Sequence, residues 1–278
     1  MKKNPIGIFD SGFGGLTVMK EIVAALPEYD YIYLGDNARA PYGPLPFETV
    51  YKYTLECVQW FFEQGCSLVI LACNTASAKA LRNIQQKDLP TLDASKRVLG
   101  VIRPTTELLG NFTKTNHVGI MATEGTVASL SYVLETKKFF PEIKVTQEPC
   151  PEWVQLVETA KHNSTEAALS VEKHITNILK KDKKIDCILL ACTHYPLLIN
   201  TINEYVPKHV KVLMQGKIVA DSLVKYLNNH PEIAEKCSKN GLKSFYTTGN
   251  VADFDNHASL FFGSEIASKQ LISRRNQM

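Results

Sequence analysis

The sequence contains no long, uninterrupted apolar run. No hydrophobic stretch is long enough to span a bilayer, and the opening Met1–Pro5 lacks the apolar core of a secretory signal. The net charge is only +3 over 278 residues, and the chain has no long Lys/Arg cluster. We therefore expect a cytoplasmic protein that binds neither a membrane nor a nucleic acid.

Cysteine is present, but not in the patterns of structural sites. Seven cysteines in a long chain without an export signal are an odd number, which disfavours a disulfide framework. No two of them have C-x-x-C spacing, so neither a zinc ribbon nor a thioredoxin-type site is indicated. The sequence therefore predicts no metal site, and five of the seven cysteines fit the behaviour of small buried hydrophobes.

The glycine motifs of nucleotide-binding sites are also missing. A glycine-rich turn, Asp10–Gly15, follows a short apolar segment, but Thr17 occupies the place of the third glycine in G-x-G-x-x-G. An aspartate directly after a strand would also repel a phosphate. We expect these glycines to let the backbone approach a small ligand, to which Asp10 and Ser11 present polar groups.

The composition is that of a globular α/β protein. Hydrophobic residues make up 45% and charged residues 21%, and the length suffices for two domains. Apolar segments of strand length alternate with helical patterns, which is typical of parallel sheets covered by helices. We expect two similar, doubly wound α/β domains with mainly parallel sheets and a site in the cleft between them. The first comprises residues 1–97 and 208–278, and the second comprises residues 98–207.

The two halves share an order of elements. Gly7–Ser11 has a counterpart in Gly119–Thr123, and each half continues to a strand that ends in cysteine, which indicates an internal duplication. The polar stretch 89–96 is expected to be irregular, and the tail is expected to return to the first half, which is short of strands. The expected helices cover about 16–26, 47–64, 76–86, 126–137, 165–180, 218–229 and 252–262.

Two similar segments carry the chemistry. Ser67–Thr75 and Asp186–His194 each begin as a buried strand and end in Ala-Cys followed by small polar residues. Ligands of open α/β sheets bind beyond the carboxyl ends of the strands, so Cys73 and Cys192 are expected to flank one cleft. A thiolate can take a proton from one face of a carbon while a thiol delivers one to the opposite face. This inverts a stereocentre such as an amino-acid α-carbon.

Each thiol has a polar neighbour that could set its protonation state. His194 lies two residues beyond Cys192, so both side chains point the same way in an extended chain, and Asp10 could assist Cys73 in a similar way. Hydroxyls and amides for holding a substrate are available from Ser11, Asn74, Thr75, Thr123, Thr126 and Thr193. Thr75 and Thr126 could equally be helix N-caps.

These motifs resemble those of glutamate racemase, within the aspartate/glutamate racemase superfamily. The matching pieces, in the family's order, are Asp10–Val18, Gly35–Asp36, Pro41–Gly43, Cys73–Ala76, Ala122–Thr126, Leu156–Glu158 and Ala191–Leu198. The resemblance implies two similar α/β domains and a cofactor-independent interconversion of L- and D-glutamate, which supplies D-glutamate for peptidoglycan. It also suggests a homodimer.

The resemblance assigns roles to individual residues. Cys73 and Cys192 become the acid/base thiols, Asp10 and His194 assist them, and Glu158 is a further acidic residue of the site. The implied substrate contacts are Ser11, Tyr42, Gly43, Asn74, Thr75 and Thr193. The chain departs from the family's usual pattern at Ile102–Thr106, where a Pro-Gly-Ala turn is usual, and at Trp153–Gln155, where an apolar-proline run is usual.

Other functions remain open on the sequence. Aspartate racemases share the two-cysteine plan, so racemisation of a related acidic amino acid or a hydantoin is the nearest alternative. A non-catalytic amino-acid-binding protein could have the same cleft, although binding alone does not need two thiols. A dithiol redox protein would need the sulfurs within disulfide reach, whereas a racemase needs them separated by a substrate carbon.

Overall fold

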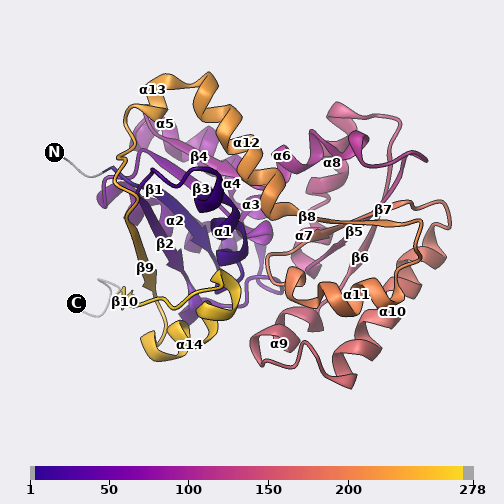
Figure 1. Cartoon of the computed structure of the whole chain (residues 1–278). Helices are drawn as coiled ribbons and strands as arrows, with labels where there is room; N and C mark the ends of the chain where they lie inside the picture. The colour runs from indigo at the N-terminus through magenta and orange to yellow at the C-terminus, as the bar shows by residue number, and fades with distance from the viewer. Residues whose placement is uncertain (1–3, 272–278) are drawn as a thin grey trace.

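The computed structural model describes residues 4–271 and contains two sheets in which every strand pairing is parallel. The first sheet has the order β10-β9-β2-β1-β3-β4, and the second has the order β6-β5-β7-β8. The strands are β1 (Ile6–Asp10), β2 (Tyr31–Gly35), β3 (Leu68–Leu71), β4 (Arg97–Gly100), β5 (His117–Ala122), β6 (Lys144–Pro149), β7 (Cys187–Ala191), β8 (Lys211–Met214), β9 (Lys243–Thr247) and β10 (Ser268–Gln270). The two sheets form separate lobes (Figure 1), so the predicted fold class is confirmed.

Helices connect the strands of each lobe. The first half contains α1 (Leu16–Ala25), η1 (Asn37–Arg39), α2 (Phe47–Glu63), α3 (Asn74–Lys79), α4 (Leu81–Asn83), η2 (Ile84–Asp88) and α5 (Leu89–Leu92). The second half contains α6 (Ile102–Thr106), η3 (Leu109–Asn111), α7 (Glu124–Ala128), α8 (Ser131–Phe139), α9 (Glu152–Glu158), α10 (Thr165–Lys181), η4 (Tyr195–Leu198) and α11 (Ile199–Tyr205). The tail adds α12 (Gln215–Asn229), α13 (Pro231–Ala234) and α14 (Val251–Phe262).

The inner strands of both sheets are largely buried, which explains their mostly apolar sequences. β1, β3 and β7 are buried along their whole length, and alternate residues of each strand belong to different apolar clusters, as expected of a sheet covered on both faces. The register of β1 and β3 places Phe9 opposite Leu71. The residues that follow these two strands therefore emerge at the same edge of the first sheet.

Two strands lie in a different sheet from the one expected. Arg97–Gly100 pairs with β3 and forms an edge of the first sheet, although the predicted second domain began at residue 98. Lys211–Met214 pairs with β7 in the second sheet, although residues 208–278 were expected in the first domain. In each case the preceding helices form a crossover that returns the chain parallel to the strand it has just left. The return of the tail to the first sheet is confirmed, because β9 pairs with β2 and β10 with β9.

Two local expectations were also wrong. The stretch 89–96 is not wholly irregular, because it begins with α5. The single helix expected over residues 126–137 is divided into α7 and α8, since Leu130 between them has a left-handed backbone with φ of 56°.

The two lobes are packed together rather than loosely tethered. One buried apolar cluster contains residues of both sheets, such as Ile8 of β1 and Leu190 of β7. After β8, α12 begins where the two lobes meet, runs along the first lobe toward α13 and packs against α1 (Figure 1). Within residues 4–271, no helix has the length and apolar character needed to cross a membrane.

Candidate active site

The two predicted thiols lie beyond the carboxyl ends of central strands in different sheets. Cys73 follows β3 and Cys192 follows β7, and the residues are 5% and 6% exposed. Burial raises the pKa of the Cys73 thiol to about 12, and negative charge on Asp10 or Cys192 adds to this effect. Asp10 and Cys192 therefore both lie within electrostatic range of the Cys73 thiol.

Cys73 has two polar neighbours of its own. Its sulfur caps α3 by accepting a hydrogen bond from the Ala76 N–H at 3.4 Å, and it lies 3.5 Å from the Ser11 hydroxyl. Both contacts favour the thiolate and oppose the effect of burial on its pKa. The N-cap of α3 is therefore Cys73 rather than Thr75.

Asp10 links the two halves of the molecule. It is fully buried, and its carboxylate accepts hydrogen bonds from the Gly12 N–H at 3.0 Å and from the Thr193 hydroxyl at 3.3 Å. Burial raises the pKa of Asp10, against the opposing effects of the His194 charge and these hydrogen bonds. Within residues 4–271 no hydrogen bond joins Asp10 to Cys73, so its influence on that thiol is electrostatic.

His194 lies between Cys192 and Glu158. Its Nδ1 is 4.0 Å from the Cys192 sulfur, and its Nε2 is 2.9 Å from Oε1 of Glu158. Burial alone would lower the pKa of His194, but hydrogen bonds to Cys192 and Glu158, and their negative charges, raise it to about 10. An imidazolium is therefore available at neutral pH as the counterion of a Cys192 thiolate.

Three threonine hydroxyls meet between the halves. Oγ1 of Thr75 is 2.9 Å from that of Thr123 and 3.4 Å from that of Thr126, and the latter two are 3.1 Å apart. Thr123 also caps α7 by accepting a hydrogen bond from the Thr126 N–H, so Thr126 is not the cap. Such hydroxyls suit a carboxylate, because each can turn its proton toward an anionic oxygen.

Tyr42 and Gly43 can contact a ligand through their backbone N–H groups rather than through side chains. Tyr42 is 1% exposed, and its hydroxyl donates to the buried carboxylate of Asp36. Gly43 lies against Thr123, since a Cβ at this glycine would be 3.3 Å from the Thr123 Cβ. Neither backbone N–H finds a hydrogen-bond partner among residues 4–271, which leaves both available to a bound anion.

Asn74 belongs to a buried network that the sequence did not reveal. Its Nδ2 donates to Oε1 of Gln215 at 2.7 Å, and its Oδ1 accepts from the Tyr132 hydroxyl at 2.5 Å. Gln215 in turn donates to Tyr132 and to Thr105. These partners come from α8, α12 and α6, and no local motif marks them.

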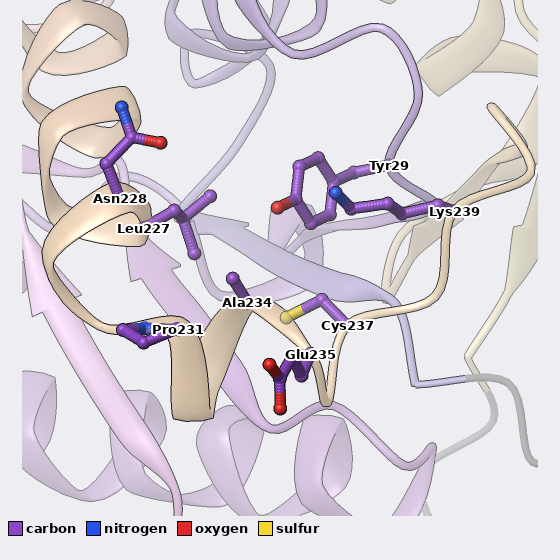
Figure 2. Close-up of a pocket in the computed structure, with 8 residues that line it drawn as sticks. All are labelled: Tyr29, Leu227, Asn228, Pro231, Ala234, Glu235, Cys237 and Lys239. Carbon is purple, nitrogen blue, oxygen red and sulfur yellow. The ribbon is translucent and has the colours of Figure 1, made fainter.

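The structure has one hollow that borders the predicted site residues and one that lies apart from them. One of about 370 Å³ is bordered by Glu158, with Phe13 and Phe254 among its other lining residues, and so reaches the edge of the site. The other, of about 360 Å³, lies near the start of β2 and includes Tyr29 and Cys237 (Figure 2). No predicted site residue borders the second hollow.

The comparison with known proteins agrees with this geometry. Over residues 6–223 the sequence matches the family described as Asp/Glu/Hydantoin racemase. The chain belongs to this family. A relative in the Asp/Glu/hydantoin racemase family, the glutamate racemase of Ruegeria sp. (strain TM1040), is 37% identical over 271 residues, covering 94% of this chain and 97% of that protein.

Solved structures of the Asp/Glu/hydantoin racemase family have the same fold. A glutamate racemase of Bacillus anthracis superposes with a TM-score of 0.88 at 31% identity, covering 98% of both chains. The glutamate racemase of Francisella tularensis in complex with D-glutamate superposes with a TM-score of 0.86 at 29% identity, again covering 98% of both chains. The predicted resemblance to glutamate racemase is thus confirmed.

Proposed function

We propose that this family member interconverts L- and D-glutamate by proton transfer between the substrate α-carbon and two thiols. The observation that carries the proposal is the convergence of Cys73 and Cys192, each at the end of a central strand of a different sheet. Glutamate is favoured as substrate because the relatives described above are glutamate racemases.

The surroundings of the thiols suit a two-base reaction. Cys192, beside the His194 imidazolium, acts as the thiolate that removes the α-proton of one enantiomer. Cys73, whose pKa is raised to about 12 by burial, remains a thiol at neutral pH and delivers a proton to the opposite face. The reverse reaction uses the same groups with their roles exchanged, and the scheme requires no cofactor.

The polar groups around the thiols match a zwitterion with two carboxylates. The hydroxyls of Thr75, Thr123 and Thr126 and the free N–H groups of Tyr42 and Gly43 are suited to carboxylate oxygens. The remaining proposed contacts are Asp10, Ser11, Asn74, Thr193 and His194. We expect the buried Asp10 carboxylate to serve the α-ammonium group, since it is the only acidic group of this set.

The biological setting is part of the same proposal. D-glutamate made by this reaction would enter peptidoglycan and so support cell-wall synthesis and cell shape. We expect the protein to act in the cytoplasm, where L-glutamate is available, and to form a homodimer.

Circular dichroism of L-glutamate incubated with the purified protein tests the proposal. We expect the signal to decay to zero with the unmodified protein and to persist with Cys73→Ala and with Cys192→Ala. Cys237→Ala is a matched control, because Cys237 is equally buried but borders the distant hollow. Full activity in either of the first two variants would contradict the two-thiol mechanism.

The same assay separates the alternatives. Decay with L-aspartate but not with L-glutamate would retain the mechanism and change the substrate. No decay with either, and no exchange of the α-proton in D₂O, would favour an amino-acid-binding protein. Rapid formation of a disulfide between Cys73 and Cys192 in mild oxidant would favour the redox alternative.

A further inference from the structure

A buried histidine outside the proposed active site holds the helix that carries Glu158. His174 of α10 is 4% exposed, and each of its ring nitrogens faces a carboxylate. Nδ1 is 2.8 Å from Oε1 of Glu148, and Nε2 is 3.2 Å from Oε2 of Glu152. Both ring nitrogens are therefore within hydrogen-bond distance of a carboxylate oxygen, and His174 bridges the two side chains.

The bridge fixes the start of α9. Glu148 belongs to β6 and is held by Lys181 at 2.6 Å and Asn177 at 3.2 Å as well as by His174. Glu152 is the first residue of α9, which lies beside α10 (Figure 1). His174 therefore ties the first turn of α9 to the sheet and to α10 at once.

The other end of α9 reaches His194. Glu158 is its last residue and makes the 2.9 Å contact with His194 Nε2. Glu152 and Glu158 are six residues apart, so the helix carries the constraint over about 9 Å at roughly 1.5 Å per residue.

Aromatic packing provides a second connection to the same histidine. The Trp153 ring packs edge-on against the rings of His174 and Tyr195, with ring centroids 5.9 Å and 4.8 Å apart. Tyr195 directly follows His194 in the sequence. The Trp153 indole N–H also donates to Ser170 of α10 at 3.1 Å. Both routes lead from the His174 bridge to the imidazole beside Cys192.

We propose that His174 is a positioning residue, which sets the contact between Glu158 and His194 through Glu152 and α9. It touches neither thiol, so it acts on Cys192 only through these groups. The inference concerns the reactivity of Cys192 and rests on the proposed function only for its relevance to catalysis.

The test measures the alkylation rate of Cys192 by iodoacetamide at pH 7.5, with peptide mapping by mass spectrometry. Cys73 is an internal reference in the same molecule. We expect His174→Phe and Glu152→Ala each to slow alkylation of Cys192 by roughly threefold to tenfold, the effect of losing one such hydrogen bond. Glu152→Gln keeps an acceptor oxygen for His174 and is expected to restore most of the rate.

Double variants distinguish positioning from general loosening of the fold. In a Glu158→Ala background, His174→Phe is expected to cause no further slowing, because the contact that it sets is already lost. Equal slowing at Cys73, additive losses in the double variant, or unchanged rates in His174→Phe and Glu152→Ala would overturn the inference. So would an unchanged rate in Glu158→Ala alone.

A matched control removes a different histidine–carboxylate contact of the same lobe. His117 at the start of β5 lies 2.7 Å from Asp182, at the opposite end of that strand from Thr123. His117→Phe is expected to leave Cys192 alkylation unchanged. Because alkylation needs no turnover, failure of the unmodified protein to racemise glutamate would refute the proposed function while this experiment still decided the role of His174.

Discussion

Gln215 offers a demanding test of how the buried network holds Asn74. Gln215 is 4% exposed and Asn74 is 2% exposed, so neither gains solvent as a substitute partner. We consider Gln215→Leu, which keeps a side chain of similar size but removes the oxygen and nitrogen of the side-chain amide. The variant deprives the Asn74 amide of its acceptor, and deprives Tyr132 and Thr105 of a donor.

The loss of the Gln215 hydrogen bonds does not affect Asn74, Tyr132 and Thr105 equally. The Tyr132 hydroxyl still donates to Asn74, and the Thr105 hydroxyl still donates to the Val101 carbonyl at 2.8 Å, so neither is left without a partner. The Asn74 amide hydrogen is left unpaired in a buried site, which costs about 1–3 kcal/mol. With the smaller losses at the two hydroxyls, we expect the free energy of unfolding to fall by about 2–4 kcal/mol.

Urea-induced unfolding followed by far-UV circular dichroism measures this change, provided that the dependence on urea concentration is the same in both proteins. Gln86→Leu is the control, because Gln86 is exposed, and we expect it to change stability by no more than about 0.5 kcal/mol. Tyr132→Phe and the double variant complete a cycle that should show strong coupling. A loss in Gln215→Leu no larger than that in the control would refute the reasoning.

Two further predictions concern the approach to His194. At Gly14 an added Cβ would lie 2.3 Å from the Thr193 hydroxyl and 2.5 Å from His194 Nδ1, whereas at Gly12 the nearest atom is 3.4 Å away on Glu158. Gly14→Ala is therefore expected to reduce turnover of L-glutamate at least tenfold, and Gly12→Ala to reduce it much less; equal losses would contradict this. The second prediction concerns the pH dependence of stability. Because the folded protein raises the pKa of His194 from 6.5 to about 10, the charged imidazolium stabilises the fold fully below pH 6.5. This contribution is lost as the pH rises toward 10. Glu158→Ala should lower the pKa of His194, so the variant should be less stable than the unmodified protein below pH 6.5, and this difference in urea unfolding should shrink between pH 6.5 and 10. A difference that does not change with pH would contradict the raised pKa of His194.

Local sequence patterns predicted the parts of the structure that depend on local chemistry. Apolar segments of strand length located β3 and β7, and the polar residues after them emerge at the sheet edges where the thiols lie. Sheet membership depends instead on which neighbour a strand meets, and the sequence of β4 or β8 does not encode that partner. This is why both strands were assigned to the wrong half.

The site shows the same division between local and distant information. Cys192 and His194 lie two residues apart and were predicted to meet, and the structure brings them together. Gln215 lies 141 residues from Asn74 in sequence, and an isolated glutamine at a helix start carries no signal of such a contact. Long-range partners of this kind become visible only when the crossover connections have placed their helices.

The unlike surroundings of the two thiols have a consequence for the proposed reaction. Cys192 has an imidazolium counterion, whereas Cys73 has a hydroxyl, one backbone N–H and the repelling charge of Asp10. In the proposed reaction Cys192 is the thiolate that removes the α-proton, so this arrangement suits the enantiomer whose α-proton faces Cys192. After one turnover the thiolate lies at Cys73, where burial opposes it. The starting form of the proposed cycle is restored when the proton that Cys192 has taken up is transferred to the Cys73 thiolate, and no other group is released or taken up.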